Sequence, residues 1–173
     1  AHEKNSDDEF LPYLRDEETL SRPWAIPGTP GLEHRLGGIE KAEHTGHVSY
    51  DPENHHRMVK LRQEKVNRIQ QDIAPTDVFG DDHGEMLILS WGGTYGACRS
   101  AVETLHEEGK KVSHAHLRWI SPLPKDLGEI IIGFNNVLVP EINLGQLLRL
   151  IRSEYLVDAQ GLNLVRGRPI GAS

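Results

Sequence analysis

Two loops of the sequence carry residue types that could bind a ligand where a helix begins. The stretch LSWGGTYGA lies between an apolar run and a helical pattern, and the free N–H groups of a helix N-terminus can bind an anion. The stretch VPEINLGQL ends another apolar run, at the point where α/β sheets bind ligands. The candidates for a ligand or interface site are Gly93, Thr94, Tyr95, Gly96, Glu141 and Asn143.

Both loops also have an interpretation that involves no ligand. The dinucleotide fingerprint G-x-G-x-x-G is incomplete, because Trp91 occupies the position of its first glycine. Residues 112–123 contain no Asp or Glu that could bind a ribose, and no P-loop lysine follows the glycines. Thr94 can instead cap the next helix, and Glu141 with Asn143 can cap the turn and helix after the later run. A structural turn and a ligand or subunit contact both remain open.

The ten histidines raise the question of a metal site. His44 and His47 are three residues apart, a spacing that two ligands of one metal can have. Gly46 and the turn-like sequence around it provide no rigid helix to maintain that spacing, so we expect hydrogen-bonding or interface roles and no metal. The residues considered for this cluster are Glu40, Glu43, His44, His47, His55 and His56.

No set of residues predicts catalysis within this chain. Cys98 lies on the apolar side of its predicted helix, which favours a small core residue over a nucleophile. The G-x-S-x-G motif of a serine nucleophile is missing from the sequence. We therefore expect no catalytic residue here.

Composition excludes several classes of function. The 173 residues carry a formal net charge of −7, whereas nucleic-acid binders are normally basic. No apolar run approaches the roughly 20 residues of a membrane span, and the polar start AHEKNSDDEF does not predict a signal peptide. A single cysteine excludes an internal disulfide and fits a reducing compartment. We expect a cytoplasmic protein that binds neither nucleic acid nor membrane.

The elements that position the two loops are predicted in three parts. Residues 1–50 are rich in proline and glycine and predict an irregular arm that packs on a partner or belongs to a neighbouring domain. A helix over residues 51–75 begins with Asp51 as N-cap and ends before Pro75. Residues 85–173 alternate strand and helix patterns.

That alternation predicts an α/β domain with a mostly parallel sheet flanked by helices. The expected strands are residues 85–91, 111–120, 135–142 and, more weakly, 162–167. The expected helices are residues 94–108, a short one around 127–131, and 144–155.

Taken in order, these motifs resemble the C-terminal region of the α subunit of 2-oxoacid:ferredoxin oxidoreductases, most closely the 2-oxoglutarate type. The resemblance begins near Pro23 and covers nearly all of the remaining chain. The stretches that carry it are PGTPGLEHRLGGIEKAEHTGHVSYDPENHHRMVKLRQEKV, SWGGTYGACRSAVETL and VLVPEINLGQLLRLIRSEYLVDAQGLNLVRGRPI.

The resemblance implies a thiamine-diphosphate enzyme that converts a 2-oxoacid and coenzyme A into an acyl-CoA, carbon dioxide and reduced ferredoxin. In that family a separate β subunit largely binds thiamine diphosphate, magnesium and an iron–sulfur cluster. An earlier domain of the α subunit completes the active site with a Tyr-Pro-Ile-Thr-Pro type motif, which this sequence lacks. The chain is therefore similar to the domain that follows, a transketolase C-terminal-like domain that supports subunit assembly.

The resemblance thus implies an assembly domain that binds no cofactor itself and is inactive alone. Its implied partners are the remainder of the α subunit, the β subunit and, through the complex, ferredoxin, and a homodimer is an additional possibility. The alternative is a free-standing α/β module that binds a nucleotide or another anion through Gly93, Thr94 and Gly96.

Overall fold

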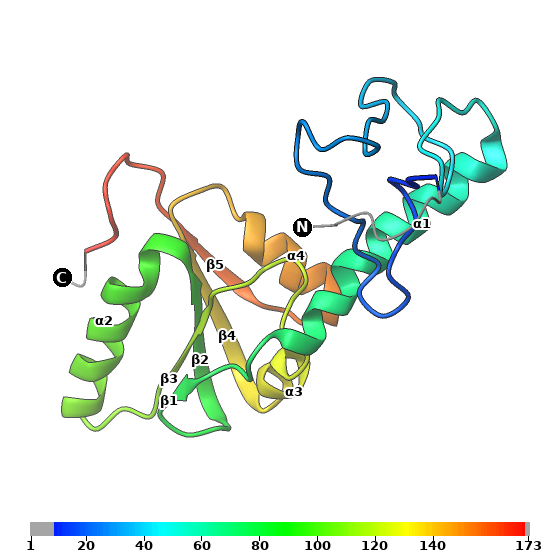
Figure 1. Ribbon diagram of the computed structural model, residues 1–173. Helices are drawn as coiled ribbons and strands as arrows, with labels where there is room; N and C mark the ends of the chain where they lie inside the picture. The colour runs from blue at the N-terminus through cyan, green and yellow to red at the C-terminus, as the bar shows by residue number, and fades with distance from the viewer. Residues whose placement is uncertain (1–8, 172–173) are drawn as a thin grey trace. The chain divides into compact units, whose positions relative to one another are not determined.

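The computed structural model describes residues 9–171 and divides into two compact units, Ala1–Ile69 and Gln70–Ser173 (Figure 1). This division places the boundary after the long first helix. The sequence-based domain boundaries at residues 50 and 85 stay a prediction.

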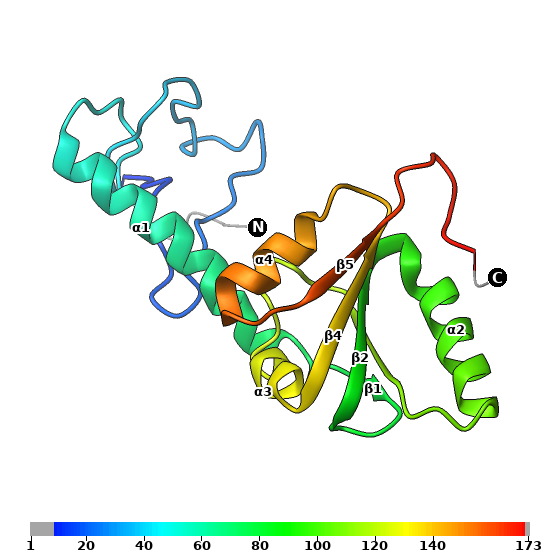
Figure 2. The same ribbon diagram turned by 180° about the vertical axis from the view of Figure 1, so that it is seen from behind.

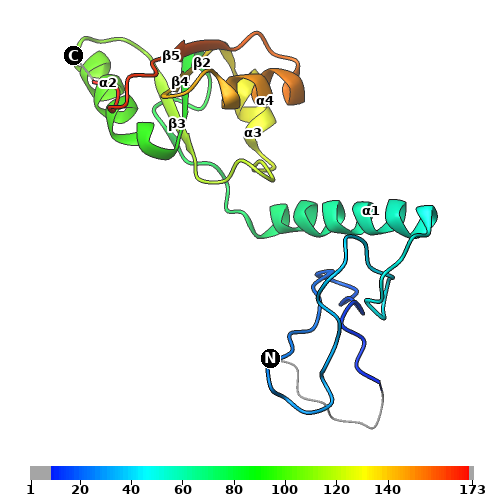
Figure 3. The ribbon, with the colours of Figure 1, turned by 90° about the horizontal axis from the view of Figure 1, so that it is seen from above.

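In the first unit an irregular arm packs on one long helix. Residues 9–50 contain only isolated bridges and turns, and they loop against one side of α1 (Pro52–Arg68; Figure 3). Leu20 and Leu32 of the arm are buried, and Met58 of the helix is fully buried. The arm therefore has a small apolar core of its own.

The helix α1 begins where the sequence predicts. The carboxylate of Asp51 accepts the backbone N–H of Glu53 at 3.1 Å, and proline stands in the first turn. The α-helix ends at Arg68, and the 3-10 turn η1 (Ile69–Asp72) follows, so the expected extension to residue 75 is wrong. Pro75 disfavours a helical conformation at the residue before it, which shortens the element.

The second unit contains a five-stranded sheet in the order β1-β3-β2-β4-β5. Its pairs are parallel except for β1 with β3, which confirms the predicted α/β class and mostly parallel sheet. The strands are β1 (Val78–Phe79), β2 (Gly84–Trp91), β3 (Ser113–Leu117), β4 (Phe134–Glu141) and β5 (Gln160–Asn163). The two-residue β1 was not predicted, and β5 lies earlier than the expected 162–167.

Helices cover both faces of this sheet (Figures 1 and 2). The helices α3 (Leu127–Ile132) and α4 (Gln146–Tyr155) lie on one face over the larger apolar cluster. The helix α2 (Tyr95–Glu107) lies on the other face, where a smaller cluster includes Cys98 and Val102. Burial of Cys98 fits its predicted role in the core.

The topology brings the two candidate loops together. The strands β2 and β4 are neighbours in the sheet, with Leu87 opposite Val137. After β2 the chain goes to β3 on one side of this pair, and after β4 it goes to β5 on the other side. Connections that depart in opposite directions open a crevice at the carboxyl ends of the two strands. The loops after β2 and β4 line this crevice.

We predict that the arm depends on the buried Met58 side chain. Met58→Ala removes apolar contacts and costs about 2–4 kcal/mol if the site cannot collapse, so thermolysin should cleave residues 9–50 faster than in the wild type. Val59→Ala is the control, because Val59 is 46% exposed. Equal cleavage rates in the two variants would contradict this account of the arm.

Candidate functional site

A buried carboxylate joins the two candidate loops at the end of the sheet where the parallel strands have their carboxyl termini. Glu141, the last residue of β4, is fully buried. Its Oε1 accepts a hydrogen bond from the indole Nε1 of Trp91, the last residue of β2, at 3.1 Å. The same oxygen accepts the side-chain amide of Asn143 at 3.0 Å.

The Glu141 carboxylate also occupies the N-terminus of α4. It accepts the backbone N–H of Leu147 at 2.9 Å and that of Leu148 at 3.0 Å. Asn143 Oδ1 accepts the N–H groups of Gly145 and Gln146 at 2.8 and 2.9 Å. These contacts confirm the capping interpretation of Glu141 and Asn143, and they place an internal anion where an external anion would bind.

The glycine loop after β2 turns tightly into α2 through the 3-10 turn η2 (Gly92–Thr94). Thr94 is buried, and its hydroxyl donates to the Trp91 carbonyl at 2.8 Å instead of capping α2. Gly92 has a φ of +56°, a conformation that favours glycine. A Cβ at Gly93 or Gly96 would meet nothing within 4 Å, so packing within the described residues does not require glycine there. A ligand or interface role for this loop stays a prediction.

A hydrogen-bonded pair of histidines lies beneath α2 and was not singled out by the sequence analysis. His114 Nε2 and His116 Nδ1 each lie 2.7 Å from the hydroxyl oxygen of the fully buried Ser90. The available signal was the HAH pattern in β3, since residues i and i+2 of a strand share one face. Tyr95 adds its ring, centred 5.0 Å from that of His116.

Burial favours the neutral form of both histidines. Burial lowers the pKa of His114 to about 4, and the neighbouring His116 and Arg99 act in the same direction. Burial and Arg118 also lower the pKa of His116. One serine hydroxyl can donate to one imidazole while it accepts from the other. The two hydrogen bonds join β2 to β3, and Ser90 is fully buried, so this arrangement offers no accessible nucleophile.

The only cysteine, Cys98, is inert in this setting. Burial raises the pKa of its thiol, although hydrogen bonding to Ser90 and Thr94 opposes the shift. A protonated buried thiol is a poor nucleophile and a poor metal ligand.

The histidine-rich segment forms contacts with acids on the first unit. His55 Nδ1 contacts the carboxylate of Glu40, and Arg57 pairs with Glu43 at 2.8 Å. Within residues 9–171 the His, Cys, Asp and Glu side chains form no group of three or more that could hold a metal ion.

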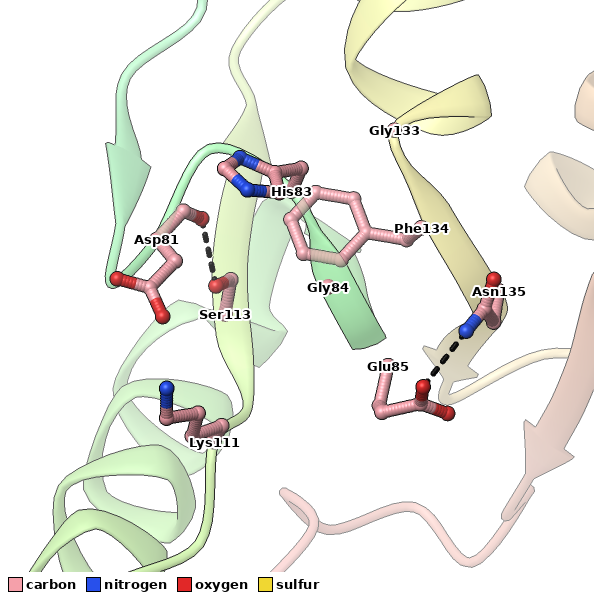
Figure 4. A pocket seen from close by; sticks show the side chains of 9 residues that line it. All are labelled: Asp81, His83, Gly84, Glu85, Lys111, Ser113, Gly133, Phe134 and Asn135. Atoms are coloured by element: carbon pink, nitrogen blue, oxygen red, sulfur yellow. Dashed lines mark hydrogen bonds between the residues drawn. The ribbon is translucent and has the colours of Figure 1, made fainter.

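A cavity of about 400 Å³ lies at the opposite edge of the sheet, where β2, β3 and β4 begin (Figure 4). Ser113 Oγ donates to the carbonyl of Asp81 at 2.7 Å, and Asn135 donates to Glu85 at 2.7 Å. Lys111 lies on the side of Asp81 and Ser113 (Figure 4). Ligands of such sheets bind at the carboxyl edge, so this cavity does not coincide with the candidate loops.

We predict that Glu141→Gln destabilises the second unit. The wild-type carboxylate has two acceptor oxygens, whereas the glutamine amide has one. The NH₂ group of glutamine would therefore face N–H donors to which it cannot serve as an acceptor. The loss should be about 2–3 kcal/mol in urea unfolding. Glu129→Gln, on the exposed surface of α3, is the matched control. A loss no larger than that of the control would refute the structural role of this carboxylate.

We also predict that stability falls in mild acid because of His114. Its pKa is about 4 in the folded chain and 6.5 in the unfolded chain, so the unfolded chain takes up the proton first as the pH falls. The contribution of neutral His114 to the free energy of unfolding is complete above about pH 6.5, and about 2 kcal/mol of it is lost at pH 5. Urea midpoints between pH 7 and 5 measure this loss. His114→Gln should flatten the profile, whereas His83→Gln at an exposed site should not.

Comparisons with known proteins place these features in context. Residues 84–168 match the family described as pyruvate:ferredoxin oxidoreductase core domain II. The chain is 48% identical to the 2-oxoglutarate oxidoreductase subunit KorA of Mycobacterium tuberculosis over 159 residues, which cover 91% of this chain and 24% of that protein. It is 30% identical to the α subunit of 2-oxoacid:ferredoxin oxidoreductase 1 of Aeropyrum pernix, covering 84% of this chain and 23% of that protein.

The fold is also similar to a solved structure. The 2-oxoglutarate:ferredoxin oxidoreductase from Magnetococcus marinus, with 2-oxoglutarate, coenzyme A and succinyl-CoA bound, matches with a TM-score of 0.86 and 30% identity. The match covers 98% of this chain and 30% of that chain. The chain thus spans about a quarter of the length of the two curated relatives. None of the helices in residues 9–171 has the length and hydropathy of a membrane span.

Proposed function

We propose that this chain is the C-terminal assembly region of a 2-oxoacid:ferredoxin oxidoreductase α subunit. Residues 84–168 belong to the pyruvate:ferredoxin oxidoreductase core domain II family. The chain as a whole is a homologue of such α subunits. In this proposal the complete complex decarboxylates a 2-oxoacid, 2-oxoglutarate in this case. The acyl group is transferred to coenzyme A, carbon dioxide leaves, and the electrons pass to ferredoxin.

One observation carries this proposal. The identity of 48% extends over 91% of the chain, including the irregular arm as well as the α/β unit. An arm with little regular structure has few packing constraints, so unrelated sequences would not stay alike there. Identity in the arm therefore supports common descent. The choice of 2-oxoglutarate follows the names of the relatives in Mycobacterium tuberculosis and Magnetococcus marinus.

Residues 9–171 offer no group of His, Cys, Asp and Glu side chains that fits the iron–sulfur cluster or the magnesium ion of the proposed complex. Iron–sulfur clusters are held by several cysteine thiolates, and the single Cys98 is a buried thiol. Magnesium prefers carboxylate and other oxygen ligands, but the Glu141 carboxylate already accepts four hydrogen bonds. We therefore propose that thiamine diphosphate, magnesium and the cluster are bound elsewhere in the complex.

The role left to this chain in the proposal is assembly. Its partners are the remainder of the α subunit and the β subunit, and it meets ferredoxin only through the complex, in the cytoplasm. Glu141 already neutralises the N-terminus of α4, so a free-standing nucleotide-binding module, the alternative, would have to bind its anion at the start of α2, through Gly93, Thr94 and Gly96.

The proposal predicts association without independent activity. The chain, mixed with the remainder of the α subunit and the β subunit, should co-elute with them in size-exclusion chromatography. The assembled complex should reduce ferredoxin in the presence of 2-oxoglutarate and coenzyme A, whereas the chain alone should not.

Calorimetric titration of the isolated chain separates the two functions. We expect no saturable binding of adenine nucleotides or coenzyme A at micromolar concentrations. Saturable binding, together with a failure to associate with the subunits, would favour the nucleotide-binding module instead.

A further inference from the structure

The arm exposes more apolar surface than its own unit requires. Ile39 is fully exposed, Tyr50 is 95% exposed and Leu36 is 82% exposed. Trp24 and Ile26 of the same arm are also exposed. Scattered apolar side chains are normal on a protein surface, whereas gathered ones mark interaction sites.

Two of these side chains line a cavity of about 620 Å³ on the first unit. Ile39, Val48 and Tyr50 form its apolar wall. Its polar part includes Arg35 and Glu40. We call this cavity the arm pocket.

The loop that forms the arm pocket is held rigidly. Lys41 is only 5% exposed, and its ammonium group donates to the carbonyl of Arg35 at 3.1 Å and to that of Gly37. Lys41 and Val48 pair as an antiparallel bridge, and Ser49 N–H donates to the Glu40 carbonyl at 3.2 Å. The exposed tip at Ile39 therefore projects from a loop whose backbone is already fixed.

The charges of the arm pocket are unequally matched. The Glu40 carboxylate contacts His55 and Arg62, and these contacts with the Lys41 N–H lower its pKa to about 2. Arg35 forms no ion pair within residues 9–171, although the chain as a whole carries a charge of −7. The pocket thus offers an apolar wall beside a cation that has no ion-pair partner among residues 9–171, and this combination suits an apolar group next to a carboxylate.

We propose that the arm pocket docks a segment of the β subunit that presents an apolar side chain beside an Asp or Glu. This inference rests on the proposed function for the identity of the partner. A small molecule inside the cavity would leave the tips of Leu36 and Ile39 bare, so a protein surface fits better. A preorganised loop contributes most to binding affinity when two separate chains associate. A domain tethered to its partner in the same chain already has a high effective concentration and needs this contribution less.

The test uses the full-length α subunit and titrates it with the β subunit by biolayer interferometry. Ile39→Ser removes the apolar tip, and Arg35→Glu reverses the unmatched charge. Each should weaken binding about tenfold or more, as substitutions at interface anchors do. The matched controls are Ile132→Ser, at a residue 75% exposed on the second unit, and Lys60→Glu, at an exposed residue of α1. The controls should bind as the wild type does.

A photo-crosslinker in place of Ile39 identifies the docked segment. We expect a crosslinked β-subunit peptide with an acidic residue beside an apolar one, and reversing that acid to lysine should restore binding to Arg35→Glu. A crosslink within the α subunit, or variants that bind like their controls, would overturn the docking role and leave the proposed function standing. Failure of the wild-type subunits to bind one another would overturn the proposed function itself.

Discussion

The contacts of the Glu141 carboxylate are the constraint on which the second unit depends. They join the end of β2 through Trp91, the loop after β4 through Asn143 and the first turn of α4 through Leu147. A buried charge is tolerated only when its hydrogen-bonding capacity is satisfied, and four donors satisfy this one. The same contacts place a carboxylate at the N-terminus of α4, which disfavours the binding of an external anion there.

The opposite face of the sheet is stabilised by a neutral network, not by a charge. Ser90 lies in β2, the strand next to β4, and it links His114 and His116 beneath α2. The low pKa of His114 means that this network tolerates no added proton without loss of stability. The strand β2 therefore makes polar contacts on both faces of the sheet, through Trp91 to Glu141 and through Ser90 to His114 and His116.

The first unit combines a small apolar core with polar contacts to the backbone. Its buried apolar residues are few, whereas Lys41 closes one loop on backbone carbonyls and Arg68 donates to the carbonyls of Glu17 and Glu18 at 2.7 and 2.6 Å. Hydrogen bonds from charged groups to backbone are directional, so they fix the loops without covering apolar side chains. An arm built in this way keeps residues such as Ile39 available for a partner, which fits a region that assembles subunits.

The sequence by itself determined the local elements and the fold class. Asp51 and Pro52 predict the start of α1, and alternating apolar runs predict the parallel sheet, because capping and periodicity act over a few residues. The role of Glu141 as a cap was one of two open interpretations, and the HAH pattern in β3 places two histidines on one face but does not reveal Ser90 as their partner. Only the tertiary structure decided these, because their partners are far apart in the chain, as Trp91 is from Glu141, and meet only when β2 lies beside its neighbouring strands.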